Sequence, residues 1–113
     1  MKRGEIYRVR RPPGDPRPAR SFVIASRQAL IDSAFSTVIC APIFSARGVL
    51  PTQVAVGAQQ GLKHDSAIHC DGLVSLEKAK LTDYVGALSP AKMTDLDAAI
   101  TQALAIEVAD RRG

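Results

Sequence analysis

The runs Ser21-Phe-Val-Ile-Ala25 and Thr37-Val-Ile-Cys-Ala41 decide the fold class of this sequence. Both are short, apolar and rich in β-branched residues, a composition that predicts two buried strands. Residues Gln28–Phe35 lie between them and are predicted to form a helical turn. The proline that follows Ala41 is typical of a strand end or an edge strand, because proline has no N–H for the ladder. The second strand is therefore expected to end near Ala41.

Further strands are predicted on both sides of this pair. Glu5–Arg10 alternates apolar residues with arginines, which is the period-two pattern of a half-buried strand. Residues 11–19 contain four prolines and one glycine and are therefore expected to form a loop. The remaining β-prone runs are Gln53–Val56, Ala67–Cys70, Leu73–Leu76 and Tyr84–Leu88. Five or more short strands are thus expected.

The end of the chain changes to a helical period. Ser89 is a suitable N-cap, and Pro90 suits the first helical position. An apolar stripe with spacings of three and four residues follows, formed by Met93, Leu96, Ile100, Leu104 and Val108, and Asp110–Gly113 ends in a glycine stop. Short strands plus one terminal amphipathic helix predict a single, mainly β domain over residues 1–113. We expect a small, strongly bent antiparallel barrel that packs against the helix.

Positive charge is concentrated in the first quarter of the chain. Residues 1–27 hold eight basic residues against two acidic ones, a net charge of +6, whereas residues 28–113 carry a net charge of −2. Seven of the eight are arginines, which bind phosphate or carboxylate with two parallel hydrogen bonds. The segment is therefore expected to meet a polyanion, either nucleic acid or an acidic protein segment. The alternative is a solvated strand edge whose charges oppose aggregation.

Several classes of protein are not indicated. No apolar run reaches the length of a membrane-spanning helix, and no apolar leader segment follows the basic start. The two cysteines, Cys40 and Cys70, stand singly, which predicts reduced thiols in a cytoplasmic protein. The sequence has no glycine-rich phosphate loop, no His-Glu-x-x-His and no Gly-x-Ser-x-Gly, so no cofactor is expected.

The densest polar cluster is His64-Asp-Ser-Ala-Ile-His-Cys-Asp71. His69 and Asp71 stand two residues apart in the predicted strand, so we expect them on one face, about 7 Å apart along the chain. An imidazole beside a carboxylate can divide proton donation and acceptance, and a surface pair without catalytic consequence is the alternative. A metal site would use His64, Asp65, His69 and Asp71. Their spacing matches no recognised ligand pattern, so no metal is expected.

Three further positions are candidates for function. Arg20 lies between the proline-rich loop and a buried strand, a junction where a rigid scaffold holds site residues; a solvated surface arginine is the alternative. Ser45 can donate to a phosphate or serve only the turn. Phe44 is expected in the core rather than as a surface for base stacking, in a chain with 4% aromatic residues.

Taken in order, these segments resemble the MazF/PemK family of toxin endoribonucleases from bacterial type II toxin–antitoxin modules. The resemblance rests on Arg3-Gly-Glu-Ile6, Arg20 before Phe22-Val-Ile-Ala-Ser26, Ser36-Thr-Val-Ile-Cys-Ala-Pro-Ile43, Gly61-Leu-Lys-His-Asp-Ser66, Cys70-Asp71, Lys80-Leu81 and Gly86-Ala-Leu-Ser89. It runs from residue 2 to about residue 108. It implies an SH3-like barrel, a homodimer whose interface binds RNA, and an acidic antitoxin that occupies the same basic groove.

The chain departs from the family pattern at two positions. Phe44 stands where the family usually has a catalytic Thr, and Ser21 stands where a Pro usually follows the catalytic arginine. In the PemK-like branch an Arg and an Asp flank the Cys as acid and base, and here those positions are His69 and Asp71. The resemblance therefore implies that Arg20, His69 and Asp71 are catalytic. We expect RNA contacts from Arg8, Arg10, Arg17, Ser21, Ser45 and His64.

The implied reaction is metal-independent cleavage of single-stranded RNA at a short sequence. A base takes the proton of a ribose 2′-OH, the oxygen attacks phosphorus, and an acid protonates the leaving 5′-oxygen. Arg20 would stabilise the phosphoryl charge, with Asp71 as base and His69 as acid or the reverse. Two alternatives stay open: a CcdB-like toxin that binds a topoisomerase, and a catalytically weak family member that only binds antitoxin.

Overall fold

The computed structural model describes residues 1–46 and 48–107. In chain order the elements are β1 (Glu5–Val9), β2 (Arg20–Ile24), α1 (Gln28–Asp32), β3 (Thr37–Ser45), β4 (Gln53–Val56), η1 (Ala58–Gln60), β5 (Ser66–His69), η2 (Cys70–Gly72), β6 (Val74–Glu77), η3 (Lys78–Lys80), β7 (Asp83–Ala87) and α2 (Pro90–Ala103). Each predicted strand has a counterpart whose ends lie within one residue of the prediction, except that β3 runs on to Ser45.

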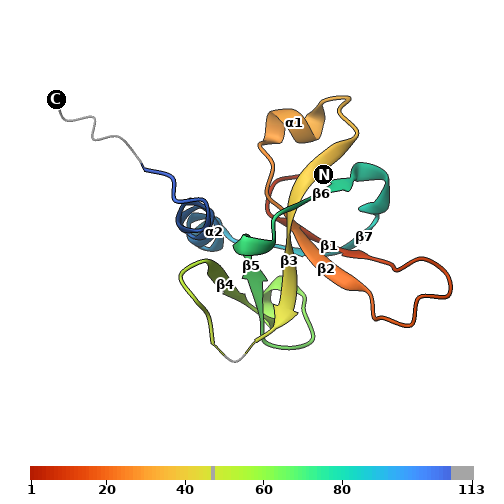
Figure 1. Cartoon of the computed structure of the whole chain (residues 1–113), viewed down its shortest axis with the longest axis horizontal. Helices are drawn as coiled ribbons and strands as arrows, with labels where there is room; N and C mark the ends of the chain where they lie inside the picture. The colour runs from red at the N-terminus through yellow and green to blue at the C-terminus, as the bar shows by residue number, and fades with distance from the viewer. Residues whose placement is uncertain (47, 108–113) are drawn as a thin grey trace.

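The sheet is built around β3 (Figure 1). The hydrogen-bonded order is β4-β5-β3-β2-β1-β7, and β6 pairs with β3 beside that path. β3 pairs with β6 through Thr37–Cys40 and with β5 through Ile43–Ser45, and every pairing is antiparallel. The prediction of a mainly β fold is confirmed as a curled antiparallel half-barrel with a C-terminal helix.

Pro42 lies inside β3, so the expectation that this strand ends near Ala41 is wrong. On one side Pro42 pairs with Phe22 of β2. On the other side it lies between the stretch paired with β6 and the stretch paired with β5, where a missing N–H costs no ladder hydrogen bond. Gly72 packs against the proline there, because an added Cβ at Gly72 would lie 3.0 Å from the Pro42 Cγ.

A hydrophobic core lies on each face of the sheet, because neighbouring side chains of a strand point to opposite faces. The core under α2 includes Ile6, Val23, Ile43, Ile68 and Leu96. The core on the other face includes Tyr7, Ile24, Ile31 of α1, Val38 and Leu81. Fully burying one large aliphatic side chain contributes about 1.5–3 kcal/mol, so the two cores together hold the strands in register.

The start of α2 follows the prediction. The Ser89 hydroxyl accepts the backbone N–H of Lys92 at 3.2 Å, and Pro90 is the first helical residue. The predicted stripe packs against the first core through Met93, Leu96 and Ile100. This places α2 along β4, where Lys92 Nζ donates to the Ala55 carbonyl at 2.5 Å.

The helix ends earlier than the sequence pattern predicts. It stops at Ala103, so the expectation that Leu104 continues the buried stripe is wrong, and the Leu104 side chain is 56% exposed. Ala105 adopts a positive φ of 53°, which a right-handed helix does not tolerate. The predicted glycine stop, like Val108, lies outside the described residues.

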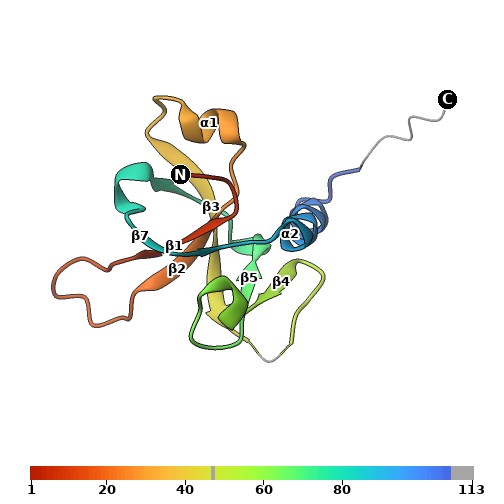
Figure 2. The same ribbon diagram turned by 180° about the vertical axis from the view of Figure 1, so that it is seen from behind.

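The β1–β2 loop projects from the sheet on the side away from α2, as both views show (Figures 1 and 2). Residues 10–19 form it, and they hold three of the eight basic residues of the first quarter. Part of the positive charge of the first quarter therefore lies in this projecting loop, whereas Arg3 pairs with Asp97 of α2. Arg20, one of the three catalytic candidates, lies where this loop returns to the sheet.

Candidate active site

Four adjacent strands place a row of side chains on one face of the sheet. Ser21 of β2 pairs with Ile43 of β3, so the next residues along, Arg20 and Phe44, lie across from each other. Phe44 in turn pairs with Ala67 of β5. His69, two residues after Ala67, is on the same face as Ala67 and pairs with Gln53 of β4. The row therefore runs Arg20, Phe44, His69, Gln53.

Phe44 is the centre of this row. The Arg20 guanidinium carbon lies 4.1 Å from the centroid of the Phe44 ring, within cation–π range. The His69 ring meets Phe44 edge-on, with centroids 4.7 Å apart and an interplanar angle of 73°. The prediction that Phe44 lies in the core is wrong, because the residue is 36% exposed. The ring lies between the two candidate catalytic groups.

Asp71 is not on the strand face predicted for it. β5 ends at His69, and the chain turns into η2 at Cys70, so strand alternation does not extend to Asp71. The turn keeps Cys70 buried in the first core. The Asp71 carboxylate instead accepts a hydrogen bond from the Thr52 hydroxyl at 2.7 Å. The two proton-transfer candidates are therefore held by different neighbours.

Sequence reasoning missed Thr52 and Gln53. Gln53 Nε2 lies 3.5 Å from His69 Nδ1, and Thr52 holds Asp71. Both residues lie at the start of β4, which is paired with β5. The sequence indicated only that two predicted strands separated by a turn-rich segment could form a hairpin. Counting back from that long turn pairs Gln53 with Cys70, one residue away from the observed partner His69.

The candidate RNA-binding residues fall into separate groups. Arg8 and Ser21 are direct partners across β1 and β2, so they share the face opposite Arg20. Arg8 and Arg10 are exposed. Ser45 likewise points to the opposite face from Phe44, its neighbour in β3. Arg20 lies on Phe44, whereas Arg8, Ser21 and Ser45 lie on the opposite face of the sheet.

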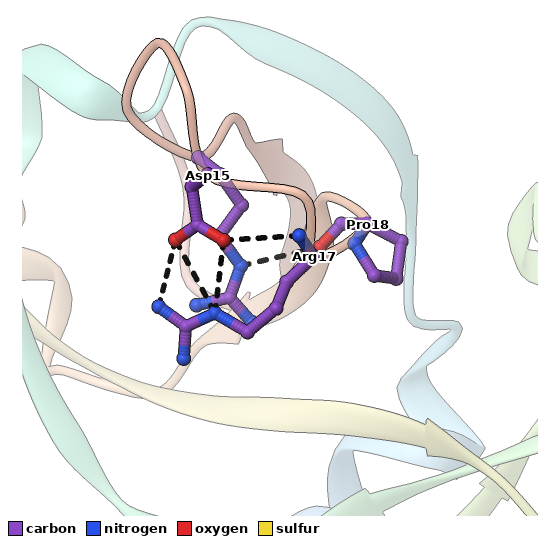
Figure 3. A network of polar contacts seen from close by, with 4 residues as sticks. Asp15, Arg17 and Pro18 are labelled. Carbon is purple, nitrogen blue, oxygen red and sulfur yellow. Dashed lines mark hydrogen bonds and ion pairs between the residues drawn. The ribbon is translucent and has the colours of Figure 1, made fainter.

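Arg17 is engaged within its own loop (Figure 3). Its guanidinium donates to both carboxylate oxygens of Asp15, at 2.7 to 3.2 Å. These hydrogen bonds hold the pKa of the Asp15 carboxyl below its ordinary value. Arg11 Nε donates to the Pro18 carbonyl at 3.2 Å, so the proline-rich loop is internally braced. Arg17 can meet a phosphate only in competition with Asp15.

An open cavity of about 1100 Å³ lies at the end of β3 that carries Ser45. Ser45 and His64, both expected to contact RNA, line it together with Ser66, Asp65 and Lys92 of α2. Arg20, His69 and Asp71 do not line it. The structure thus brings Ser45 and His64 together but keeps them on a different surface from the catalytic candidates.

Cys40 and Cys70 are both free, as predicted, and both are buried. Burial raises the pKa of the Cys40 thiol to about 12 and that of the Cys70 thiol to about 11, with the Asp71 charge adding to the second. Neither is a reactive thiolate near neutral pH.

Within residues 1–46 and 48–107 no three His, Cys, Asp or Glu side chains gather as metal ligands would. No helix in that part of the chain has the length and apolarity to span a bilayer.

Residues 2–104 match the family model of the PemK-like, MazF-like toxin of type II toxin–antitoxin systems. The chain belongs to this family. Endoribonuclease MazF1 of Mycobacterium bovis and endoribonuclease MazF4 of Mycobacterium tuberculosis are each 29% identical to it over 104 residues, which is 92% of this chain and 92% of each relative.

Solved structures agree with this PemK/MazF assignment. An endoribonuclease in complex with its cognate antitoxin from Mycobacterial species has a TM-score of 0.80 and 28% identity, over 96% of this chain and 99% of that one. An endoribonuclease from Mycobacterial species gives 0.78 and 28%, over 96% and 95%. MazE–MazF from Deinococcus radiodurans, with a TM-score of 0.69, 12% identity and coverage of 93% and 94%, shows a common fold. The implied SH3-like barrel of the PemK/MazF family thus corresponds to the curled half-barrel described above.

Proposed function

We propose that this PemK/MazF-family toxin is a metal-independent endoribonuclease that cuts single-stranded RNA at a short sequence. Its mycobacterial relatives are named endoribonucleases and align with 92% of the chain. The observation that carries the proposal is the Arg20 guanidinium, which lies on Phe44 beside His69 and has no carboxylate partner among the described residues. A guanidinium whose charge is not neutralised suits the phosphoryl oxygens of a transition state.

Arg20, His69 and Asp71 divide the reaction between them. Arg20 binds two phosphoryl oxygens as negative charge builds up on them. Asp71 takes the proton of the ribose 2′-OH, whose oxygen forms the new bond to phosphorus, and His69 protonates the 5′-oxygen as its bond to phosphorus breaks. Thr52 holds the Asp71 carboxylate, whereas Gln53 lies beside the His69 imidazole. These different neighbours support two separate roles for Asp71 and His69. The alternative is that His69 is the base and Asp71 the acid.

The expected binding partners of the protein follow from its charge and from its structural relatives. The net charge of +6 in residues 1–27 suits both an RNA backbone and an acidic antitoxin segment. One structural relative was solved in complex with its cognate antitoxin. We expect the single domain of residues 1–113 to act in the cytoplasm as a homodimer, with one groove that binds either partner.

Two other functions have less support. A CcdB-like toxin that binds a topoisomerase needs no unpaired guanidinium beside an imidazole, and the named relatives are endoribonucleases. A catalytically silent toxin that only binds antitoxin is favoured by one observation, because Phe44 cannot donate a hydrogen bond. Against it, the Phe44 ring supports Arg20 rather than displacing it.

The test is incubation of the purified protein with single-stranded RNA in excess EDTA, followed by mapping of the new ends. We expect cleavage to persist and to leave a 2′,3′-cyclic phosphate, or the 3′-phosphate formed from it, opposite a 5′-hydroxyl. Cleavage that disappears on chelation and returns with one divalent metal would contradict metal independence. Antitoxin binding without any cleavage would instead support the silent alternative.

A further inference from the structure

We propose that Phe44 is a positioning residue that holds the Arg20 guanidinium and the His69 imidazole in place for the reaction. This inference rests on the proposed function and concerns the position where the family resemblance leads one to expect a Thr. The Phe44 ring then has a role of its own in the site, in addition to the absence of the Thr hydroxyl.

Phe44 restrains Arg20 without neutralising it. The guanidinium carbon lies 4.1 Å from the ring centroid, and the other contact of this side chain is a hydrogen bond from Nη1 to the Ile43 carbonyl at 3.3 Å. In the described chain Arg3 and Arg17 are each paired with an aspartate, but Arg20 is not. A carboxylate partner would cancel the charge that a phosphate needs, whereas an aromatic ring fixes the group and leaves that charge in place.

The same ring restrains His69. The two rings meet edge-on with centroids 4.7 Å apart, an arrangement that aromatic pairs prefer. The polar contact from Gln53 Nε2 to His69 Nδ1 is 3.5 Å long, at the outer limit for a hydrogen bond. Phe44 is therefore the better-defined of the two contacts that orient the imidazole.

Strand pairing explains how one ring reaches both groups. Arg20 is across from Phe44 on β2, while Phe44 pairs on its other side with Ala67, whose side chain is small and fully buried. His69 is the diagonal neighbour on β5, a separation that aromatic side chains bridge. A Thr at this position would offer a hydroxyl but no ring face, and it is too short for the diagonal contact.

The experiment compares Phe44→Leu, Phe44→Tyr and the control Phe35→Leu. Phe35 is 59% exposed and lies in the connection before β3. Phe35→Leu therefore makes the same substitution as Phe44→Leu, but at a position outside the candidate site. Two quantities are measured: kcat and KM for RNA cleavage, and the NMR signal of the Arg20 Nε–Hε group, assigned by its loss in Arg20→Lys. Ring-current displacement of that signal reports the contact with the phenyl ring even when no RNA is present.

Phe44→Leu is expected to lower kcat about 10-fold or more with a smaller change in KM, since loosely held catalytic groups lose rate. Its Arg20 signal should move to the position of a solvated arginine. Phe44→Tyr keeps the ring and should restore both readouts, and Phe35→Leu should match the wild type. Thermal unfolding confirms that each variant is folded.

Failure of this inference is distinguishable from failure of the proposed function. A wild-type protein that cuts no RNA overturns the endoribonuclease activity and with it the positioning role. A wild-type protein that cuts RNA, with Phe44→Leu at wild-type kcat, overturns the positioning role alone. An Arg20 signal that is the same in the wild type and in Phe44→Leu would also overturn it, because the ring contact would then not exist in solution.

Discussion

Each candidate catalytic side chain has at least one identifiable neighbour that restrains it. Arg20 lies on the Phe44 ring, the Asp71 carboxylate accepts from the Thr52 hydroxyl, and His69 contacts both Phe44 and Gln53. These neighbours are uncharged, so none of them neutralises the group that it holds. At the scale of the residue the site is therefore organised by packing and by hydrogen bonds from uncharged neighbours.

Arg20→Ala should lower kcat/KM for RNA cleavage by about 10²–10³, because a donor to the phosphoryl oxygens is lost. Arg20→Lys should not restore activity, since a point charge cannot replace two parallel N–H donors. The matched control is Arg27→Ala, which removes the same charge from an exposed position at the start of α1. Activity of Arg20→Ala equal to that of Arg27→Ala would rule out a catalytic Arg20.

His69→Ala and Asp71→Ala should each lower the rate by about 10²–10⁴, the usual loss when a positioned acid or base is removed. The double variant should lose less than the product of the two single losses, because both groups serve one displacement. Single-turnover cleavage rates measure this. If both single variants cut RNA like the wild type while Arg20→Ala is inactive, the acid–base assignment is wrong.

At the scale of the element, close backbone contacts hold the half-barrel together. β7 lies directly against η1, so that a Cβ added to Gly86 would overlap the Gln60 carbonyl. The same contact includes Gly61, which follows Gln60 and has a φ of +90°. A Cβ added to Gly61 would overlap the Val85 carbonyl. Both positions require glycine because any side chain would overlap a backbone carbonyl. At Gly61 the positive φ is a second reason, because other residues rarely adopt it.

Gly86→Ala should lower the free energy of unfolding by about 1–3 kcal/mol or more, because the added methyl group has to push two backbone segments apart. Gly48→Ala is the matched control, since nothing lies within 4 Å of a Cβ added there. Urea unfolding of both variants measures the difference. Equal midpoints for the two variants would show that β7 and η1 separate easily in solution.

At the scale of the whole molecule, three arginines of the first quarter lie in the projecting β1–β2 loop, whereas Arg3 lies against α2 as the partner of Asp97. The first quarter, with its net charge of +6, supplies the β1–β2 loop on the side away from α2 (Figure 1). A long-range field from this end favours the approach of polyanions, and its effect falls off with salt. The loop is braced internally by Arg17 and Asp15, so it is presented with one of its charges already paired.

RNA affinity should therefore fall steeply as salt is added, because each arginine–phosphate contact releases condensed counterions. Arg8→Ala and Arg10→Ala should each reduce the slope of log K against log salt by about one. Arg17→Ala should reduce it less, because Asp15 already pairs with that guanidinium. Binding titrations between low and physiological salt give the slopes, and a salt-independent affinity would refute the polyanion interpretation.

The amino-acid sequence by itself determined the features that depend on neighbours along the chain. The strand positions follow from β-branched runs and alternation, the start of α2 from Ser89 and Pro90, and the charged first quarter from simple counting. Ordered short motifs were enough to identify the PemK/MazF family. All of these are local signals, which a sequence carries without knowledge of what each strand pairs with.

Only the tertiary structure decided what lies across from what. β3 passes through Pro42 because its partner changes from β6 to β5 at that point, and Asp71 leaves the predicted strand face because η2 buries Cys70. The contacts of Phe44 with Arg20 and His69 likewise join three strands that are distant in sequence. Strand register is set by non-local pairing and by burial of one face, so no local pattern specifies it, and the candidate site is a product of that register.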